Sequence, residues 1–285
     1  MSWSLYSRVL RLRHDFAEQD VSLAKILGAP RAVIGMVHLE PLPGSPRWSG
    51  SMESVAEAAL DDARALAEGG VGALLVENFG DVPFAPGRVD PACVAAMAAI
   101  ATEIRRAVPL PMGINVLRTD AMSAFAVAAA VGARFIRVNV HTGAVVTDQG
   151  ILASTAHDTL RYRRLLGVPI ALLADVQTKH AAPLASVAIE HEARDCVHRG
   201  LADGLIVSGE ATGLPPKTSD LERVRLAVPD VPLLVGSGAA PENAADLFAL
   251  ADGLIVGTSV KRDGIVTNRV DPDRVRALVR AAGPR

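Results

Sequence analysis

The sequence has few cysteines and few aromatic residues, and it lacks long apolar runs and any strong excess of one charge. The only two cysteines, Cys93 and Cys196, lie in helical patterns and show no metal-like spacing, which favours a reducing, cytoplasmic setting. The 29 basic and 31 acidic residues leave a formal net charge of -2, so the basic stripe of a nucleic-acid-binding protein is missing. Half of the 285 residues are hydrophobic, enough for a large core, which excludes both an intrinsically disordered chain and a disulfide-stapled miniprotein.

Membrane insertion is not expected from the apolar segments. The most apolar stretch, residues 121–133, falls short of the roughly 18 residues that a membrane span needs, and Ser123 and Gly132 interrupt it. Residues 1–31 carry several arginines but no apolar region as long as that of an export signal. We expect residues 1–31 to form a helical extension that closes the floor of the fold, and a basic amphipathic helix on a membrane surface is the alternative.

What the sequence does contain is a regular alternation of two patterns. Short runs rich in β-branched and apolar residues occur at 32–39, 73–78, 112–117, 135–140, 169–176, 204–208, 232–236 and 253–257. Most of these runs are continuously apolar, as in parallel strands that are covered on both faces. The segments between them repeat apolar residues with a period near 3.6, as in Val55, Ala59, Ala63 and Leu66. Eight such units predict a single α/β domain over residues 32–285, a (β/α)₈ TIM barrel, with a doubly wound sheet as the alternative.

Local signals mark the ends of the expected helices. Asp90 and Asp271 each precede a proline, a pattern typical of a helix start, and Ser219 with Glu222 has the spacing of a capping box. Several of the connections that follow strands are long, notably residues 40–50, 79–90 and 141–153. Because barrels of this type carry their chemistry on that face, polar residues at the carboxyl ends of strands are the candidates for a site.

Two glycine-containing turns follow the seventh and eighth expected strands. They read Gly236-Ser237-Gly238 and Gly257-Thr258-Ser259. Glycine lets the backbone approach an anion closely, and barrels often bind a substrate phosphate at these two loops. The two turns together predict a phosphate site, to which Lys261 is a candidate extra charge.

Two carboxylates follow apolar strands and are candidates for proton transfer. Asp175 and Glu77 are each expected at the barrel mouth, where burial raises the pKa of a carboxyl group towards neutrality. We predict Asp175 as the general base or acid, with Glu77 or His141 as its counterpart, and a structural ion-pairing role is the alternative for both acids. The predicted substrate-binding residues are His38, Asn78, Asn115, Asn139, Lys179, His180 and Ser208.

No cofactor is predicted, because no nucleotide-binding motif is present. A divalent metal held by Glu77, Asp175 and a histidine is an alternative that no tight ligand spacing supports. The expected strand at 204–208 holds no lysine, which argues against a Schiff-base aldolase.

Several motifs together resemble the BtpA/SgcQ family. They are Gly35-Met36-Val37-His38-Leu39 with residues 41–46, Val76-Glu77-Asn78-Phe79-Gly80-Asp81, residues 113–118, residues 135–143, residues 173–176, residues 211–216, Val235-Gly236-Ser237-Gly238 and residues 255–259. The resemblance covers residues 32–282 and implies a barrel of the ribulose-phosphate-binding type, similar to phosphoribosylanthranilate isomerases. The family pattern after the fifth strand is expected to read Asp-Val-His-x-Lys-His, whereas this chain has Gln177, which cannot shuttle a proton.

The resemblance implies more than one role. Some family members are described as factors for the biogenesis or stability of photosystem I, and others are found beside sugar-metabolism genes as epimerases or isomerases. From the residues, we predict a phosphate-binding enzyme that isomerises or epimerises a small phosphorylated, sugar-like metabolite. The alternatives are a non-catalytic biogenesis factor for a membrane complex, and a lyase or glycosyl-transfer enzyme acting on a sugar phosphate or nucleotide. An alanine-rich helical exterior favours a homo-oligomer.

Overall fold

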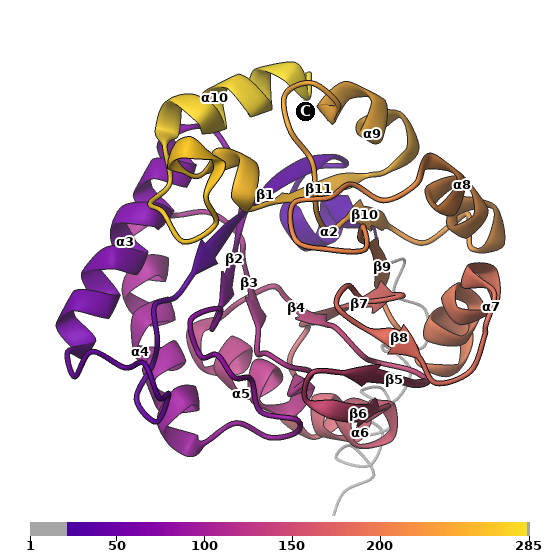
Figure 1. Cartoon of the computed structure of the whole chain (residues 1–285), viewed down its shortest axis with the longest axis horizontal. Helices are drawn as coiled ribbons and strands as arrows, with labels where there is room; N and C mark the ends of the chain where they lie inside the picture. Colours follow the sequence, from indigo (N-terminus) through magenta and orange to yellow (C-terminus); the bar gives the residue numbers. More distant parts are fainter. Residues whose placement is uncertain (1–21, 284–285) are drawn as a thin grey trace, which may run out of the picture.

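Eight parallel strands close into a barrel, as Figure 1 shows for the computed structural model, which describes residues 22–283. The strands are β1 (Ala32–His38), β2 (Ala73–Glu77), β3 (Met112–Asn115), β4 (Phe135–Val138), β7 (Ala171–Val176), β9 (Gly204–Val207), β10 (Leu233–Val235) and β11 (Gly253–Val256). They pair in the order β1-β11-β10-β9-β7-β4-β3-β2. Each strand begins and ends within two residues of an apolar run in the sequence, so the predicted (β/α)₈ barrel is confirmed.

Helices surround the barrel and follow the strands in turn (Figure 1). They are α3 (Met52–Glu68), α4 (Pro91–Ala107), α5 (Ala121–Val131), α6 (Ala156–Leu166), α7 (Ile189–Arg194) with the π-helical turn Asp195–Arg199, α8 (Thr218–Ala227), α9 (Ala244–Leu250) and α10 (Pro272–Ala281). The Asp90 and Asp271 carboxylates cap α4 and α10 as predicted. The predicted capping box at Ser219 is wrong, because α8 begins at Thr218 and has no side-chain cap.

The barrel interior is filled by every second residue of the strands. Ile34, Leu75, Phe135, Leu173 and Ile206 belong to one buried cluster inside the barrel, while their neighbours in sequence face the surrounding helices. This division follows from the two-residue period of a strand. It also means that the next inward residue along each strand reaches the carboxyl end of the barrel.

A short helix, α2 (Leu23–Leu27), closes the end of the barrel at which the strands begin. Leu23, Ile26 and Leu27 are buried in the same cluster as the interior strand residues. Of the helical extension expected over residues 1–31, residues 1–21 lie outside the described residues. Between residues 22 and 283, no helix combines the length and the apolar composition that crossing a bilayer requires.

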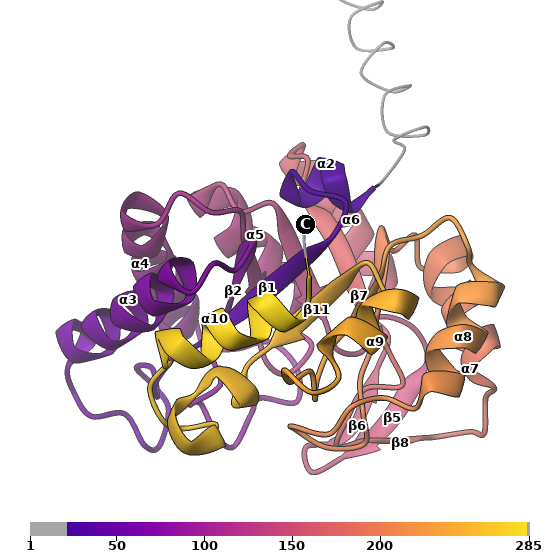
Figure 2. The ribbon, with the colours of Figure 1, turned by 90° about the horizontal axis from the view of Figure 1, so that it is seen from above.

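The opposite end carries a small antiparallel sheet (Figure 2). It consists of β5 (Ala144–Thr147), β6 (Gly150–Ala153) and β8 (Ala182–Pro183), in the order β6-β5-β8. The segment 141–153, which the sequence analysis treats as a loop, therefore contains a hairpin. Because β8 lies in the connection after β7 and pairs with β5, this sheet ties together the loops that follow two neighbouring barrel strands.

The tight contact between β3 and β4 gives a test of this core. A Cβ on Gly113 would lie 2.2 Å from Cε2 of the buried Phe135. We expect Gly113→Ala to lower the free energy of unfolding by about 1–3 kcal/mol, because the extra methyl group overpacks the interior. Urea denaturation measures the change.

Two further variants control this comparison. Gly87→Ala should be close to neutral, since a Cβ there meets no atom within 4 Å. Phe135→Leu in the Gly113→Ala background should recover part of the loss. Equal stability of Gly113→Ala and the wild type would show that the β3–β4 contact can relax.

Candidate active site

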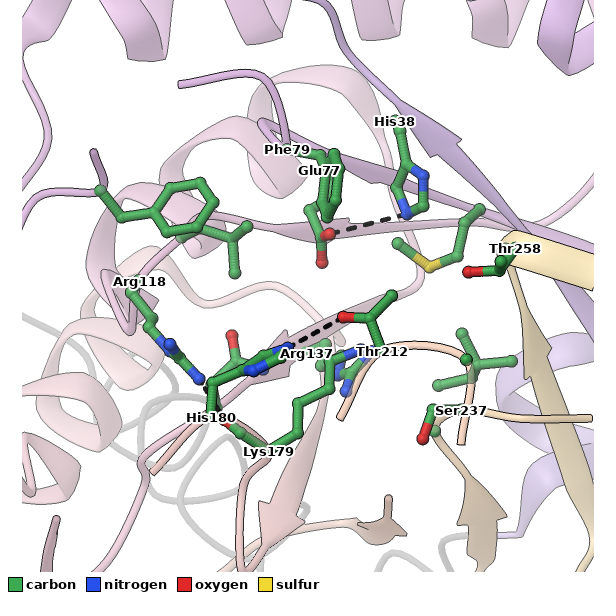
Figure 3. Close-up of a pocket in the computed structure, with 18 of the residues that line it drawn as sticks. His38, Glu77, Phe79, Arg118, Arg137, Lys179, His180, Thr212, Ser237 and Thr258 are labelled. Atoms are coloured by element: carbon green, nitrogen blue, oxygen red, sulfur yellow. Dashed lines mark hydrogen bonds and ion pairs between the residues drawn. The ribbon is translucent and has the colours of Figure 1, made fainter. Parts of the chain in front are cut away.

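A cavity of about 220 Å³ opens at the carboxyl end of the barrel strands. Its lining includes the next inward-facing residue along several strands, two positions after a residue of the interior cluster: His38 after Met36, Glu77 after Leu75 and Arg137 after Phe135. The glycine turns after β10 and β11 and the segment after β7 supply further walls. Figure 3 shows these groups facing a common space.

A buried ion pair lies beside the base of this cavity. Arg137 donates from Nε to Asp175 Oδ1 at 2.9 Å and from Nη2 to Asp175 Oδ2 at 3.0 Å. Asn139 Nδ2 donates to the same Oδ2 at 2.8 Å. Burial opposes the charge of Arg137, but the facing carboxylate outweighs it and raises the pKa of the guanidinium.

In this structure Asp175 is engaged by the ion pair rather than facing the cavity. Both of its oxygens are occupied by donors, and the residue is not among those that line the cavity. These contacts fit the ion-pairing alternative for Asp175. Arg137 and Asn139, which Asp175 holds in place, do line the cavity.

Glu77 is the carboxylate that faces the cavity. Its Oε2 accepts a hydrogen bond of 2.5 Å from Asn115 Nδ2, and its Oε1 lies 3.8 Å from His38 Nε2. Burial raises the pKa of Glu77, and the nearby charges of Arg137 and Lys179 only partly oppose this. Glu77 can therefore exchange a proton closer to neutral pH than an exposed glutamate.

His38 forms the adjoining wall as a neutral imidazole. Its ring stacks on Phe79 with centroids 4.4 Å apart. Burial and the charges of Lys261 and Lys179 lower the pKa of His38 to about 3. A Cβ on Gly257 would lie 3.0 Å from the ring, so glycine at this position lets β11 approach His38 closely.

Lys179 and Arg118 bring positive charge to the cavity. Burial, then the charge of Arg137, lowers the pKa of Lys179. Arg118 donates from Nη2 to the Lys179 carbonyl oxygen, which joins the segments after β3 and β7. His180 lines the same side, and its Nε2 lies 3.0 Å from Thr212 Oγ1.

The predicted phosphate turns lie side by side at the cavity. Gly236, Ser237, Gly238, Gly257 and Thr258 all line it, and the Thr258 hydroxyl points inward (Figure 3). Gly238 has a positive φ of 72°, and a Cβ there would lie 2.0 Å from the Pro215 nitrogen, so only glycine fits under the covering loop. The hydroxyl of Ser237 holds the same loop, because it accepts from the Gly209 N–H and donates to the Leu214 carbonyl.

Other predicted residues support the walls without lining the cavity. Asn78 accepts from the Leu117 N–H at 2.7 Å and donates to Asp81, so it braces two loops. Ser259 donates to the Ala239 carbonyl and joins the two glycine turns. Ser208 lies beneath Gly236, where its buried hydroxyl has no partner among the described residues.

His141 and Lys261 point elsewhere. His141 Nε2 donates to the Gly200 carbonyl at 2.6 Å, beside the π-helical turn and away from the cavity. Lys261 forms a buried ion pair of 2.6 Å with Asp62 on α3. Gln177, where the family pattern is expected to place histidine, is exposed and also lies outside the cavity lining.

Arg118 and Arg137 line the cavity but are not among the residues predicted from the sequence. A usable signal exists for Arg137: it interrupts the apolar run 135–138 and has the same parity as the inward-facing Phe135. Arg118 lies in a loop and had no such signal. Within residues 22–283, no three His, Cys, Asp or Glu side chains converge to hold a metal ion.

The barrel is similar to solved structures of enzymes with different chemistries. Phosphoribosyl anthranilate isomerase from Thermococcus kodakaraensis aligns with a TM-score of 0.53 at 15% identity, over 90% of this chain and 100% of that chain. N-acetylneuraminate lyase from Mycoplasma synoviae aligns with a TM-score of 0.53 at 10% identity, over 81% of this chain and 70% of that chain. At such identities the similarity shows the fold alone.

Similarity in sequence extends over most of the chain. It is 51% identical over 249 residues to the photosystem I biogenesis protein BtpA of Synechocystis sp., covering 87% of each protein. It is 34% identical over 256 residues to the sgc region protein SgcQ of Escherichia coli, covering 89% of this chain and 94% of that protein. The sequence pattern of the BtpA family matches residues 29–283. The predicted resemblance is thereby confirmed: the chain belongs to the BtpA family.

Proposed function

We propose that this protein is an enzyme that isomerises or epimerises a small phosphorylated, sugar-like metabolite by general acid–base catalysis. One observation carries the proposal: the buried Glu77 and the half-buried Lys179, which can both exchange protons, line the same small cavity as the two glycine turns. A cavity of this size suits a small metabolite rather than a polymer or a large cofactor. The proposal includes a cytoplasmic homo-oligomer that uses no cofactor.

The phosphate would bind at the turns after β10 and β11. Their glycines leave room for an anion to approach backbone N–H groups, and Thr258 offers a hydroxyl donor. Arg137 adds positive charge here, since its Nη2 lies 3.2 Å from the position that a Cβ on Gly236 would occupy. Backbone donors and a buried arginine explain how a chain of nearly zero net charge can select an anion.

The proton transfer would involve Glu77 and Lys179. Glu77, as the carboxylate, would remove a proton from carbon next to a carbonyl group, and Lys179 would stabilise the oxygen on which negative charge develops. In an isomerisation, Glu77 would then return the proton to the neighbouring carbon. In an epimerisation, a second acid would deliver a proton to the opposite face of the same carbon. The pKa of Glu77 is raised and that of Lys179 is lowered, so burial moves both towards the range in which such transfers are efficient.

A non-catalytic assembly role is the second candidate, and the name of the relative in Synechocystis favours it. Such a role gives no physical reason to place Glu77, Lys179 and Arg118 around one cavity, because burying charged groups costs free energy. A lyase or transferase reaction on the same phosphorylated ligands would use the same binding residues.

Phosphate recognition is testable with a panel of ribose 5-phosphate, ribulose 5-phosphate and fructose 6-phosphate, each beside its unphosphorylated sugar. We expect calorimetric binding of at least one phosphate and none of the free sugars. Thr258→Val should weaken that binding about 10- to 100-fold, because one hydrogen bond to a charged group is lost. Thr218→Val, on the exposed start of α8, is the matched control. Equal binding of sugars and their phosphates would contradict the proposed site.

Catalysis is testable by exchange of carbon-bound hydrogen with solvent. In D₂O, the wild type should incorporate deuterium next to the carbonyl group of a bound ketose phosphate, detected by NMR. Glu77→Gln keeps the size of the side chain and should slow exchange at least about 100-fold, because the general base is removed. A wild type that binds the phosphates but exchanges no hydrogen would favour the assembly role.

The buried Glu77 also gives a pH dependence of stability. Its pKa is raised above the ordinary 4.5, so the folded protein holds this proton more tightly than the unfolded chain. The resulting stabilisation is fully present below pH 4.5 and is lost as the pH rises through the folded pKa. Glu77→Gln should therefore gain stability relative to the wild type as the pH rises from 4 to 8 in urea denaturation.

The control for this titration is Glu57→Gln on the exposed face of α3. The change of the Glu77→Gln difference with pH is compared with that of this exposed variant. A Glu77→Gln difference that does not change with pH would show that the Glu77 carboxylate is as well stabilised in the folded protein as in water.

A further inference from the structure

Arg118 lies across the cavity from the glycine turns. Figure 3 shows its guanidinium on one side, with Ser237 and Thr258 on the other and Glu77 between them above the floor. Only 7% of the Arg118 side chain is exposed. The cavity therefore holds positive charge at an end where the proposed phosphate does not bind.

The positive charge of Arg118 is incompletely balanced. Its Nη2 donates to a backbone carbonyl, and its nearest ion pair joins Nη1 to Asp148 Oδ1 at 3.6 Å. Asp148 is 68% exposed, and an ion pair with a solvated partner contributes little. Burial accordingly lowers the pKa of Arg118, in contrast to Arg137, whose pKa is raised by the bidentate contact with Asp175.

Lys179 adds a second cation beside Arg118. Its side chain lines the cavity, and among residues 22–283 no carboxylate forms an ion pair with its amine. A cation that is shielded from solvent and has no direct ion pair is costly unless a ligand supplies one. The charges of Glu77 and Asp175 act on both cations from a distance, but among residues 22–283 no buried carboxylate forms a direct ion pair with either. Arg118 and Lys179 together thus form a site suited to an anionic ligand.

We propose that the substrate carries a carboxylate at the end opposite its phosphate, and that Arg118 and Lys179 bind this carboxylate. This inference rests on the proposed function, because it takes the phosphate to lie at the glycine turns. The planar fork of arginine donors matches the two oxygens of a carboxylate, and the small cavity favours this group over a second phosphate. The substrate class is a phosphorylated sugar acid or keto acid.

A phosphorylated sugar acid or keto acid also suits the proposed chemistry. When Glu77 removes a proton from the carbon beside a carboxylate or its adjacent carbonyl, negative charge develops on oxygen at that end of the substrate. Arg118 and Lys179 would already lie there to stabilise that charge.

Two pairs of ligands test the inference, each differing only by a carboxylate in place of a CH₂OH group. They are 3-phosphoglycerate with glycerol 3-phosphate, and 6-phosphogluconate with sorbitol 6-phosphate. We expect the carboxylate to tighten binding about 10- to 100-fold in at least one pair, as a charge-assisted hydrogen bond does. Arg118→Met should abolish this gain and leave the affinity for the matching alcohol within about twofold.

Two further variants complete the comparison. Arg118→Lys keeps the charge but removes the fork, so it should retain part of the gain; it also serves if Arg118→Met fails to fold. Arg88→Met removes an exposed arginine outside the cavity lining and should leave both affinities unchanged.

The outcomes separate the inference from the proposed function. If the two alcohols bind but neither carboxylate gains affinity, or if the gain survives in Arg118→Met, the second anion site is wrong and the phosphate site stands. If fructose 1,6-bisphosphate gains affinity through Arg118 and the carboxylates do not, the carboxylate assignment is overturned. If no phosphate binds at all, the proposed function fails and the inference fails with it.

Discussion

The bidentate contact between Arg137 and Asp175 is the interaction on which the candidate site depends. It joins the carboxyl ends of the neighbouring strands β4 and β7 inside a closed barrel. Two buried charges are tolerated because each oxygen of Asp175 receives a donor from Arg137, and Asn139 adds a third. The pair thereby fixes the guanidinium beneath Gly236 and holds Asn139 at the cavity, so the donors at the floor of the site are in place before a ligand arrives.

Small residues let the walls close around that floor. At Gly236 a Cβ would lie 2.4 Å from the Ser208 hydroxyl, and at Gly238 a side chain would collide with the loop that carries Pro215. The loop in turn is held by the hydroxyl of Ser237. Residues that a sequence pattern would assign to phosphate contact therefore do two things, since they shape the turns and also join the segments after β9 and β10.

The sequence predicts the fold well because apolar strands have a strong local pattern. It also places Glu77, His38 and the glycine turns at one cavity, since residues at the carboxyl ends of parallel strands converge. The sequence does not show which of Asp175 and Glu77 faces the cavity, because this depends on a partner that is distant in sequence. Arg137 comes from another strand and pairs with the Asp175 carboxylate, whereas Glu77 receives only the amide of Asn115. The direction of the His141 side chain is unpredictable for a related reason. It follows the end of β4, where strand parity no longer fixes the direction of a side chain, and it turns towards Gly200.

The distribution of satisfied and unsatisfied charge separates the scaffold from the site. Asp175 with Arg137, and Asp62 with Lys261, are complete ion pairs between buried partners, and neither carboxylate lines the cavity. Glu77, Lys179 and Arg118 are also shielded from solvent, but their partners are distant, neutral or exposed. Burial therefore raises the pKa of Glu77 and lowers the pKa of Lys179 and of Arg118, which in each case favours the neutral form. A fold gains nothing by keeping three such groups around one cavity, and each lowers its stability. A ligand that carries complementary charges removes this penalty on binding, which is the physical argument for a small anionic substrate rather than an unoccupied barrel mouth.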